Sequence, residues 1–398
     1  MKARYDIGRP IVFKKGIYDL NREAHLNYEL GRMINWSNGD LAEVQAVSHG
    51  IRNFADWKRV LLGLGDRAMK EGRTENAIAY YRMAEFYMDY RDPDALKYYR
   101  YAKELFYDYY AGFFEAEEGE KPIIERLEVP YEDTTLPVMN TAAAGEEKGT
   151  VLLHGGYDSY MEEFLFPMLY LREKGYRVVL FEGPGQGVML RERGKCVNWR
   201  WEEPVKAILD TLGLEQVIIV GISLGGYYAP RAAAMDKRIT AVAEWSAFPS
   251  FLDNIRVSYT GLAPALLKAL TRGSLGEKLL AGIKKKAAAG NMSAAVFTDA
   301  MHKLGADTYQ ELYEAAAKLD IRPFAEHVTQ DVLIMHGDHD VLCNVKMVDI
   351  AAALQKNAKS MTVKLLTSRY DTAGDHCNCG NTKLALDTVI YWMDSLRT

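Results

Sequence analysis

Residues 216–226 read QVIIVGISLGG, and this stretch decides the fold. Its first half is a run of β-branched apolar residues, which is typical of a strand buried on both faces of a parallel sheet. The run passes directly into Gly221-Ile222-Ser223-Leu224-Gly225, which fits the pattern G-x-S-x-G, and then into YYAPRAAAM, which favours a helix. The stretch therefore predicts a strand, a tight turn that exposes the Ser223 hydroxyl, and a helix.

Strands and helices alternate on both sides of this stretch. Short apolar runs separated by helical segments occur at 150–153, 177–181, 239–243, 331–335 and 361–366. Two more strands around a polar turn are predicted within 123–140. This alternation predicts an α/β fold with a mostly parallel sheet and helices on both faces.

The first third of the chain has a different texture. Residues 1–122 contain no convincing strand run and carry helical spacing instead, as in TENAIAYYRMAEFYMDY, where Thr74 is placed to cap a helix. Asp92-Pro93 offers an N-cap followed by proline at the first helical position. We therefore expect a helical N-terminal domain over 1–122.

A second helical region interrupts the strand–helix alternation. Residues 250–326 are helical in character and delay the next strand, which is more typical of an inserted cap than of an ordered bare loop. The α/β core is thus predicted in two parts, 123–249 and 327–398. An insertion after a strand lies at the edge of the sheet where open α/β folds hold ligands.

Composition narrows the functional classes. The 398 residues carry a net charge of −5, which argues against a dedicated nucleic-acid binder, and 48% of them are hydrophobic. We find no signal-peptide-like start and no apolar stretch long enough to span a bilayer. The four cysteines are too few for a disulfide scaffold, so we expect a cytoplasmic protein that needs no membrane.

A serine hydroxyl becomes a good nucleophile only when a base removes its proton. On this architecture the expected chain order is serine, acid, histidine. Asp340 lies in GDHD just beyond a predicted strand, with Asp338 as the competing acid, and His376 lies in the loop DTAGDHCNCG before the last helix. We predict that Asp340 orients His376 and that His376 accepts the Ser223 proton.

The negative oxygen that forms during acyl transfer needs backbone N–H donors. One predicted donor is the N–H of Leu224, directly after the nucleophile, and the other comes from the loop LLHGGYDSY, through Gly156 or Tyr157. His154 in the same loop is expected to have a structural role.

Two other motifs suggest different chemistry. HGDHD and HCNC contain residue types that bind zinc, but their spacing matches no common zinc site, so no metal is predicted. FEGPGQG resembles a phosphate-binding loop, but no Lys-Ser/Thr pair follows it, and we expect only a tight turn there.

Taken in order, HGG, GPGQG, GISLGG, GDHD and GDHC make the chain resemble an α/β-hydrolase. More narrowly, it is similar to a group that contains 2,6-dihydroxypseudooxynicotine hydrolase, the fungal polyketide-shortening hydrolases of melanin pathways and the fermentation–respiration switch protein. The similarity includes the helical stretches LGRMINWSNGDLAEVQ and AIAYYRMAEFY. The catalytic residues of that group correspond to Ser223, Asp340 and His376 in this chain.

This resemblance implies a serine-dependent enzyme that acts on a small molecule, with aromatic compounds among the candidates, and that uses no metal or organic cofactor. Members of the group hydrolyse a carbon–carbon bond next to a ketone or act as carboxylesterases, and homodimers occur among them. We expect carbon–carbon bond hydrolysis, with ester or lactone hydrolysis as the alternative and a peptidase as a lesser one. A catalytically silent interaction protein on a hydrolase fold is the remaining reading.

Overall fold

The computed structural model describes residues 4–257 and 274–397. The chain divides into two compact units, one formed by Met1–Pro122 with Ala265–Tyr313 and the other by Ile123–Pro264 with Glu314–Thr398. All the residues predicted to take part in catalysis belong to the second unit.

The second unit contains an eight-stranded sheet with the order β1-β2-β4-β3-β5-β6-β7-β8. The pairings β1–β2 and β2–β4 are antiparallel, and the remaining pairings are parallel. The strands are β1 Glu125–Tyr131, β2 Thr134–Thr141, β3 Gly149–His154, β4 Tyr176–Phe181, β5 Val217–Ile222, β6 Ile239–Trp245, β7 Asp331–Gly337 and β8 Ser360–Leu366. Every strand predicted from the sequence is present, and the predicted fold class is confirmed.

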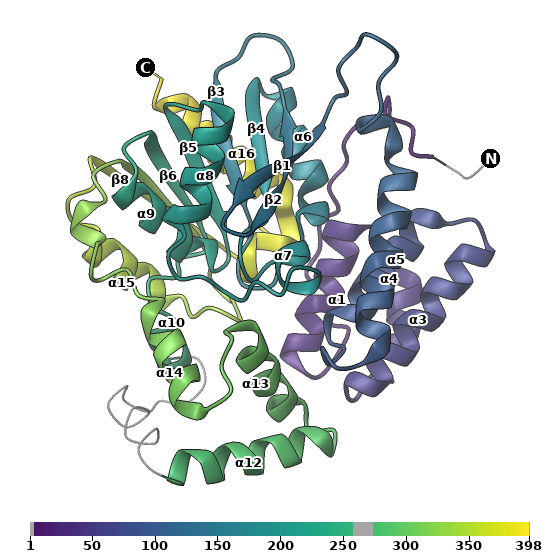
Figure 1. Cartoon of the computed structure of the whole chain (residues 1–398). Coiled ribbons are helices and arrows are strands. Elements are labelled where there is room, and N and C mark those ends of the chain that lie inside the picture. The colour runs from purple at the N-terminus through teal and green to yellow at the C-terminus, as the bar shows by residue number, and fades with distance from the viewer. Residues whose placement is uncertain (1–3, 258–273, 398) are drawn as a thin grey trace. The chain divides into compact units, whose positions relative to one another are not determined.

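Helices cover both faces of this sheet (Figure 1). Helices α8 and α9 lie on one face, and α6 and α16 lie on the other. The inner strands are hydrophobic almost throughout because both of their faces are covered. The helices of this unit include α6 Leu165–Glu173, α7 Gly187–Arg191, α8 Glu202–Leu212, α9 Gly225–Met235, α10 Phe251–Ile255, α15 Lys346–Leu354 and α16 Thr382–Ser395.

Strand register brings the ends of the parallel strands together. His154 pairs with Gly221, Ile222 pairs with Trp245, and Trp245 pairs with Met335. The segments that follow β3, β5, β6 and β7 therefore leave the sheet at the same carboxyl edge, where open α/β sheets bind ligands.

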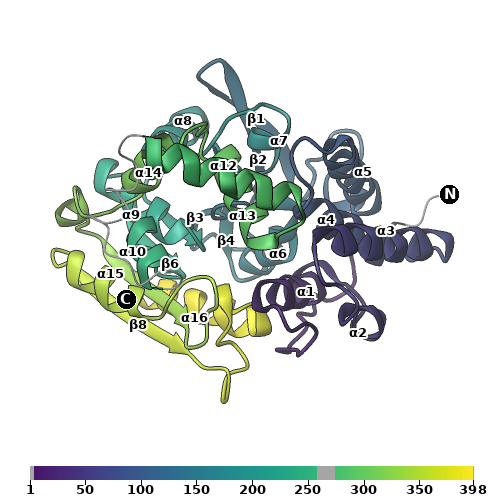
Figure 2. The ribbon, with the colours of Figure 1, turned by 90° about the horizontal axis from the view of Figure 1, so that it is seen from below.

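The first unit is helical. Its α4 contacts α1, α3 and α5, and α12 contacts α13 (Figure 2). The buried Trp57 indole donates a hydrogen bond to the Met83 carbonyl at 2.7 Å, which joins α3 to α4. These helices are α1 Ala24–Ser37, α2 Leu41–Ser48, α3 Phe54–Lys70, α4 Thr74–Phe86, α5 Pro93–Tyr109, α12 Ser274–Ala288, α13 Met292–Lys303 and α14 Tyr309–Lys318, which crosses into the second unit.

Helix boundaries test two of the capping predictions. Asp92 caps α5 by accepting a hydrogen bond from the Asp94 N–H, and Pro93 is the first helical residue, as predicted. The prediction for Thr74 is wrong: Thr74 is itself the first residue of α4, and Arg73 occupies the cap position without a side-chain hydrogen bond.

In the predicted cap over 250–326, the described residues form α10, α12, α13 and α14, joined by turns and short irregular segments. Residues 258–273 of this prediction lie outside the described residues. Within residues 4–257 and 274–397, no helix is both long and apolar enough to cross a lipid bilayer.

Glu244 in β6 is a fully buried carboxyl group within the sheet. The Gln355 side-chain amide donates a hydrogen bond to its Oε1. Burial raises the pKa of Glu244 to about 8, so the neutral acid is the stable form near pH 7.

Glu244→Gln is expected to become more stable relative to the wild type as the pH rises. Because folding raises the Glu244 pKa, its contribution to stability is greatest below its ordinary pKa and is lost as the pH rises through about 8. A glutamine does not titrate, so the difference in unfolding free energy should grow by about 1.4 kcal/mol per pH unit between these two pKa values.

Urea unfolding of both proteins between pH 5.5 and 8.5 measures this difference. Glu173→Gln, at an exposed position of α6, is the control. A Glu244→Gln difference that is as flat with pH as that of the control would show that Glu244 is not held neutral.

Candidate active site

Ser223 lies in the tight turn between β5 and α9. Its φ angle is 63°, in the left-handed region that serine rarely adopts, and its N–H donates to the Trp245 carbonyl at 2.9 Å. A Cβ on Gly221 would lie 2.3 Å from the Gly225 carbonyl oxygen, so the turn closes only with glycine at position 221. The tight turn thus places a strained, partly exposed serine at the carboxyl edge of the sheet.

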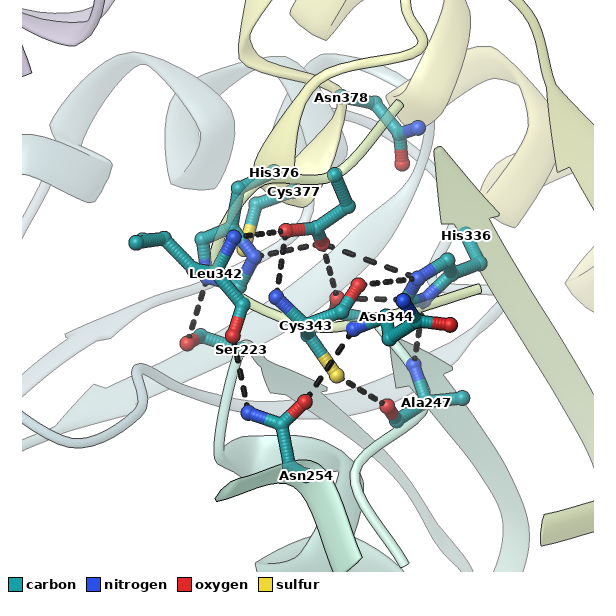
Figure 3. Close-up of polar contacts among 12 residues, drawn as sticks. Ser223, Ala247, Asn254, His336, Leu342, Cys343, Asn344, His376, Cys377 and Asn378 are labelled. Atoms are coloured by element: carbon teal, nitrogen blue, oxygen red, sulfur yellow. Dashed lines mark hydrogen bonds and ion pairs between the residues drawn. The ribbon is translucent and has the colours of Figure 1, made fainter. Parts of the chain in front are cut away.

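His376 contacts both Ser223 and Asp340. Figure 3 shows His376 beside Ser223, with the hydrogen bond between them drawn as a dashed line. His376 Nε2 lies 2.8 Å from Ser223 Oγ, and His376 Nδ1 lies 2.7 Å from Asp340 Oδ2. The Asp340 side chain is completely buried, and only 6% of the His376 side chain is exposed. A base between a serine and a buried acid is the arrangement found in serine hydrolases.

The Asp340 carboxylate is held by neighbours on both of its oxygens. Oδ1 accepts hydrogen bonds from the Leu342 and Cys343 N–H groups, each at 2.8 Å. Oδ2 accepts from Ser246 Oγ at 3.2 Å as well as from His376. The carboxylate therefore has little freedom to rotate away from the imidazole.

Asp338, the competing acid, faces other partners. Its Oδ1 accepts a hydrogen bond from the Ser368 N–H at 2.9 Å and lies 2.8 Å from His339 Nδ1. Asp338 thus ties its turn to the segment after β8, while Asp340 contacts His376.

The charges of the pair follow from burial and proximity. Burial alone would lower the pKa of His376, but the adjacent Asp340 carboxylate outweighs it and holds that pKa well above the usual value. Burial alone would raise the pKa of Asp340, but His376 and the hydrogen bonds to its oxygens keep it below the usual value. Because the Asp340 carboxylate favours the charged imidazole, His376 must be in its neutral form before it can accept the Ser223 proton.

The loop that carries His376 is strained. Cys377 and Asn378 follow it with φ angles of 52° and 53°, both in the left-handed region. The Trp245 indole donates to the Cys377 carbonyl at 2.8 Å, and the Asn378 side chain donates to the Ala373 carbonyl at 2.6 Å. These bonds hold the imidazole over Ser223 at the cost of backbone strain, which is common at active sites.

The loop after β3 lies directly against the serine turn. A Cβ on Gly156 would lie 2.7 Å from both the Leu224 nitrogen and Ser223 Cβ, so only glycine fits there. Among the described residues, the Leu224 N–H has no hydrogen-bond acceptor in the protein. The predicted donors Leu224, Gly156 and Tyr157 thus belong to two segments that meet beside the nucleophile.

His154 precedes this loop and is completely buried. Its Nδ1 lies 2.9 Å from the Gly155 carbonyl oxygen, so Nδ1 carries the proton that is donated there. Burial lowers the pKa of His154 to about 4, which leaves the ring neutral at physiological pH. The ring thus supports the loop, in line with the structural role predicted for it.

Sequence reasoning missed several residues that hold the site in place. Ser246 contacts Asp340, and the buried Asn254 in α10 donates to the Leu342 carbonyl at 2.9 Å and accepts from the Asn344 N–H at 3.2 Å. The only signal for Ser246 is a small polar residue directly after a buried strand. Nothing in the sequence singles out Asn254.

His336 was considered only as part of a metal motif. Its Nδ1 accepts from the Ala247 N–H at 3.1 Å, and its Nε2 donates to the Cys343 carbonyl at 3.0 Å. Both ring nitrogens are therefore occupied by backbone groups. In the part of the chain that the structure describes, no cluster of three or more His, Cys, Asp or Glu side chains could hold a metal ion.

Ser246→Ala is expected to lower kcat roughly tenfold, because a hydrogen bond to a charged group contributes about 1.5 kcal/mol and the other contacts of Asp340 remain. Ser246 has a φ angle of 97°. Ser246→Gly removes the same hydroxyl but also removes the backbone strain of the positive φ. It should therefore lose the same activity, while its free energy of unfolding should be about 1 kcal/mol higher than that of the alanine variant. Equal kcat values for Ser246→Ala and the wild type would show that Ser246 does not support Asp340.

A serine, a histidine and a buried aspartate at the carboxyl edge of such a sheet, with the serine on a strand–turn–helix, define a class of hydrolytic enzymes. The chain belongs to the alpha/beta hydrolase family, whose model matches residues 150–373. It is therefore a hydrolase of this family.

Two of the relatives that match this chain are fungal hydrolases. Hydrolase acrC of Aspergillus aculeatus is 32% identical over 235 residues, which cover 50% of this chain and 53% of that protein. Hydrolyase poxO of Penicillium oxalicum is 30% identical over 311 residues, 69% of this chain and 72% of that protein. The match to acrC thus spans about half of its length.

Two solved structures with the same fold align with nearly the whole of this chain. The 2,6-dihydroxy-pseudo-oxynicotine hydrolase matches with a TM-score of 0.61 and 20% identity, covering 91% of this chain and 94% of its own. AbyA5 matches with a TM-score of 0.60 and 16% identity, covering 94% of this chain and 90% of its own. At these identities the likeness concerns the fold, and it confirms the resemblance drawn from the sequence.

Proposed function

We propose that the protein is a serine hydrolase that cleaves a carbon–carbon bond next to a ketone in a small molecule. The observation that carries the proposal is the position of His376, with Nε2 at 2.8 Å from Ser223 Oγ and Nδ1 at 2.7 Å from Asp340 Oδ2. A neutral imidazole in that position can remove the serine proton and later return it.

In the first half-reaction Ser223 Oγ attacks the ketone carbon and its proton passes to His376 Nε2. The carbonyl oxygen becomes an oxyanion, which the Leu224 N–H and the Gly156–Tyr157 loop stabilise. The carbon–carbon bond then breaks, its electron pair leaves with the departing carbon, and His376 gives that carbon the proton. An acyl group remains on Ser223.

In the second half-reaction His376 takes a proton from water, and the hydroxide attacks the acyl carbon. The Ser223 oxygen leaves, regains its proton from His376, and a carboxylic acid is released. The overall reaction consumes one water and needs no metal or organic cofactor.

The leaving group separates this chemistry from its main alternative. An ester or lactone expels an alkoxide, which His376 protonates readily, whereas a carbon leaving group needs a second carbonyl or a hydroxyaryl ring to delocalise its charge. The resemblance to a group that contains 2,6-dihydroxypseudooxynicotine hydrolase favours the carbon–carbon case. A catalytically silent partner-binding protein is the contrasting hypothesis. The contact of His376 with both Ser223 and Asp340 weighs against it.

Purified protein should be tested on matched pairs of β-dicarbonyl or hydroxyaryl ketones and esters with the same acyl group. The proposal predicts turnover of the ketones, with one acid formed per bond cleaved. Turnover of the esters alone would replace carbon–carbon hydrolysis with esterase activity. Failure of every pair together with no labelling by a fluorophosphonate would support the silent protein.

The proposal also includes a cytoplasmic location and a homodimer. The location rests on the cysteine content and the homodimer on the family resemblance. Cys196, Cys343, Cys377 and Cys379 form no disulfide bond, as suits a reducing compartment.

A further inference from the structure

Gln186 lies in the turn after β4, within the motif EGPGQG at 182–187. From the sequence we expected this motif only to shape a turn. The Gln186 side chain is 1% exposed, and both ends of its amide are engaged. Nε2 donates to the Gly156 carbonyl at 2.8 Å, and Oε1 accepts from the Gly183 N–H at 2.9 Å.

The hydrogen bond to the Gly156 carbonyl also fixes the orientation of the whole Gly156–Tyr157 peptide group. In a planar trans peptide the C=O of Gly156 and the N–H of Tyr157 point in opposite directions. Gln186 therefore determines where the Tyr157 N–H points, and it points away from Gln186. The Cα of Gly156 lies against Ser223 and Leu224, so this peptide stands beside the nucleophile.

The neighbouring residues of the motif hold the rest of the same loop. The buried Glu182 accepts hydrogen bonds from the Met161 N–H at 2.9 Å and from the Val188 N–H at 2.8 Å. The Gly187 N–H donates to the Ser159 carbonyl at 3.2 Å. The turn after β4 thus fixes the loop after β3 at three points between residues 156 and 161.

We propose that Gln186 is a positioning residue that orients the Gly156–Tyr157 peptide so that the Tyr157 N–H is the second oxyanion donor, beside the Leu224 N–H. This inference rests on the proposed serine chemistry. Gln186 touches no reacting atom and acts through the peptide. This role would give the motif GPGQG a function beyond the tight turn expected from the sequence.

The size of the effect follows from the cost of losing an oxyanion donor. Removal of one donor lowers kcat by about 10²–10³-fold in enzymes of this type. Gln186→Met keeps the volume but releases the peptide without deleting it, so we expect a kcat about 10–100-fold lower. KM should change little, because an oxyanion donor acts chiefly on the transition state.

Gln330→Met is the matched control. Gln330 is also a buried glutamine that joins backbone segments, since its Nε2 donates to the Ala233 carbonyl at 2.8 Å and the Ile239 carbonyl at 3.2 Å. It lies where β6 and β7 begin, at the opposite edge of the sheet from Ser223. Its replacement costs similar hydrogen bonds without touching the loop after β3.

The experiment measures the second-order rate of fluorophosphonate labelling, and kcat and KM for 4-nitrophenyl acetate, in the wild type and both variants. We expect labelling and kcat to fall 10–100-fold in Gln186→Met and to stay within about twofold in Gln330→Met, as a transition-state effect requires. Equal rates in Gln186→Met and the wild type, or equal losses in the two variants, would overturn the inference.

A second variant adds a pH-dependent readout. In Gln186→Glu an ionised carboxylate would repel the Gly156 carbonyl, whereas a protonated one could donate to it as the glutamine does. The labelling rate of Gln186→Glu relative to the wild type should therefore rise as the pH falls, and a constant ratio would contradict the inference. A wild type that is not labelled would instead refute the serine chemistry itself.

Discussion

Replacing Ser223 with alanine should lower kcat by about 10⁵–10⁶-fold, because the variant lacks the atom that attacks the carbonyl carbon. Ser223 Oγ is the serine oxygen that His376 Nε2 contacts, at 2.8 Å. The measurement is steady-state turnover of whichever ketone or ester the wild type cleaves fastest. Folding should be intact, since alanine removes only a partly exposed hydroxyl.

Ser360→Ala is the control for this substitution. Its hydroxyl donates to Asp331 Oδ1 at 2.6 Å, at the start of β7 and β8 and away from the catalytic edge. The control should keep wild-type turnover. A Ser223→Ala enzyme that retains more than about a hundredth of wild-type kcat would mean that another group supplies the nucleophile.

Asp340→Asn should lower kcat by about 10³–10⁴-fold while leaving the geometry intact. The asparagine amide can donate to His376 Nδ1, which moves the ring proton onto Nε2. A protonated Nε2 cannot accept the Ser223 proton. Turnover and the melting temperature of the variant, measured together, separate this chemical effect from a loss of folding.

The pH profile of the same variant gives an independent readout. The Asp340 carboxylate keeps the pKa of His376 high against the effect of burial, so activity in the wild type should rise with pH as His376 loses its proton. Without the carboxylate, burial dominates and the pKa of His376 falls. The acidic limb of the kcat/KM profile should therefore shift to lower pH in Asp340→Asn, and an unshifted limb would contradict the assigned pair.

Much of this fold could be predicted because its signals are local. The run of β-branched residues before Ser223 has the composition of a strand covered on both faces, and it lies within the observed strand β5 Val217–Ile222. Chain order and strand ends were enough to single out Ser223, Asp340 and His376, because the carboxyl ends of parallel strands share one edge.

Capping predictions were less secure because they depend on one residue. Asp92 was predicted correctly, since the following proline marks the first turn of a helix. Thr74 was not, because threonine fits equally well just inside a helix, and the acidic Glu75 of the first turn suits either register.

The supporting residues could not be predicted because their roles depend on contacts between distant segments. Ser246 and Asp340 are 94 residues apart in the chain, and Gln186 is 30 residues from the Gly156 carbonyl that it binds. A lone serine after a strand, or a glutamine between glycines, has many possible partners. Only the register of β3 to β7 shows which ones are within reach.

The central claim is that His376, oriented by Asp340, activates Ser223 as the nucleophile. The most direct test is to map the covalent product of a fluorophosphonate by mass spectrometry. We predict one adduct per chain, on the peptide that contains Ser223, and no adduct in His376→Ala, because the imidazole 2.8 Å from Ser223 Oγ activates that oxygen. An adduct on a different residue, or equal labelling of Ser223 when His376 is alanine, would contradict the account.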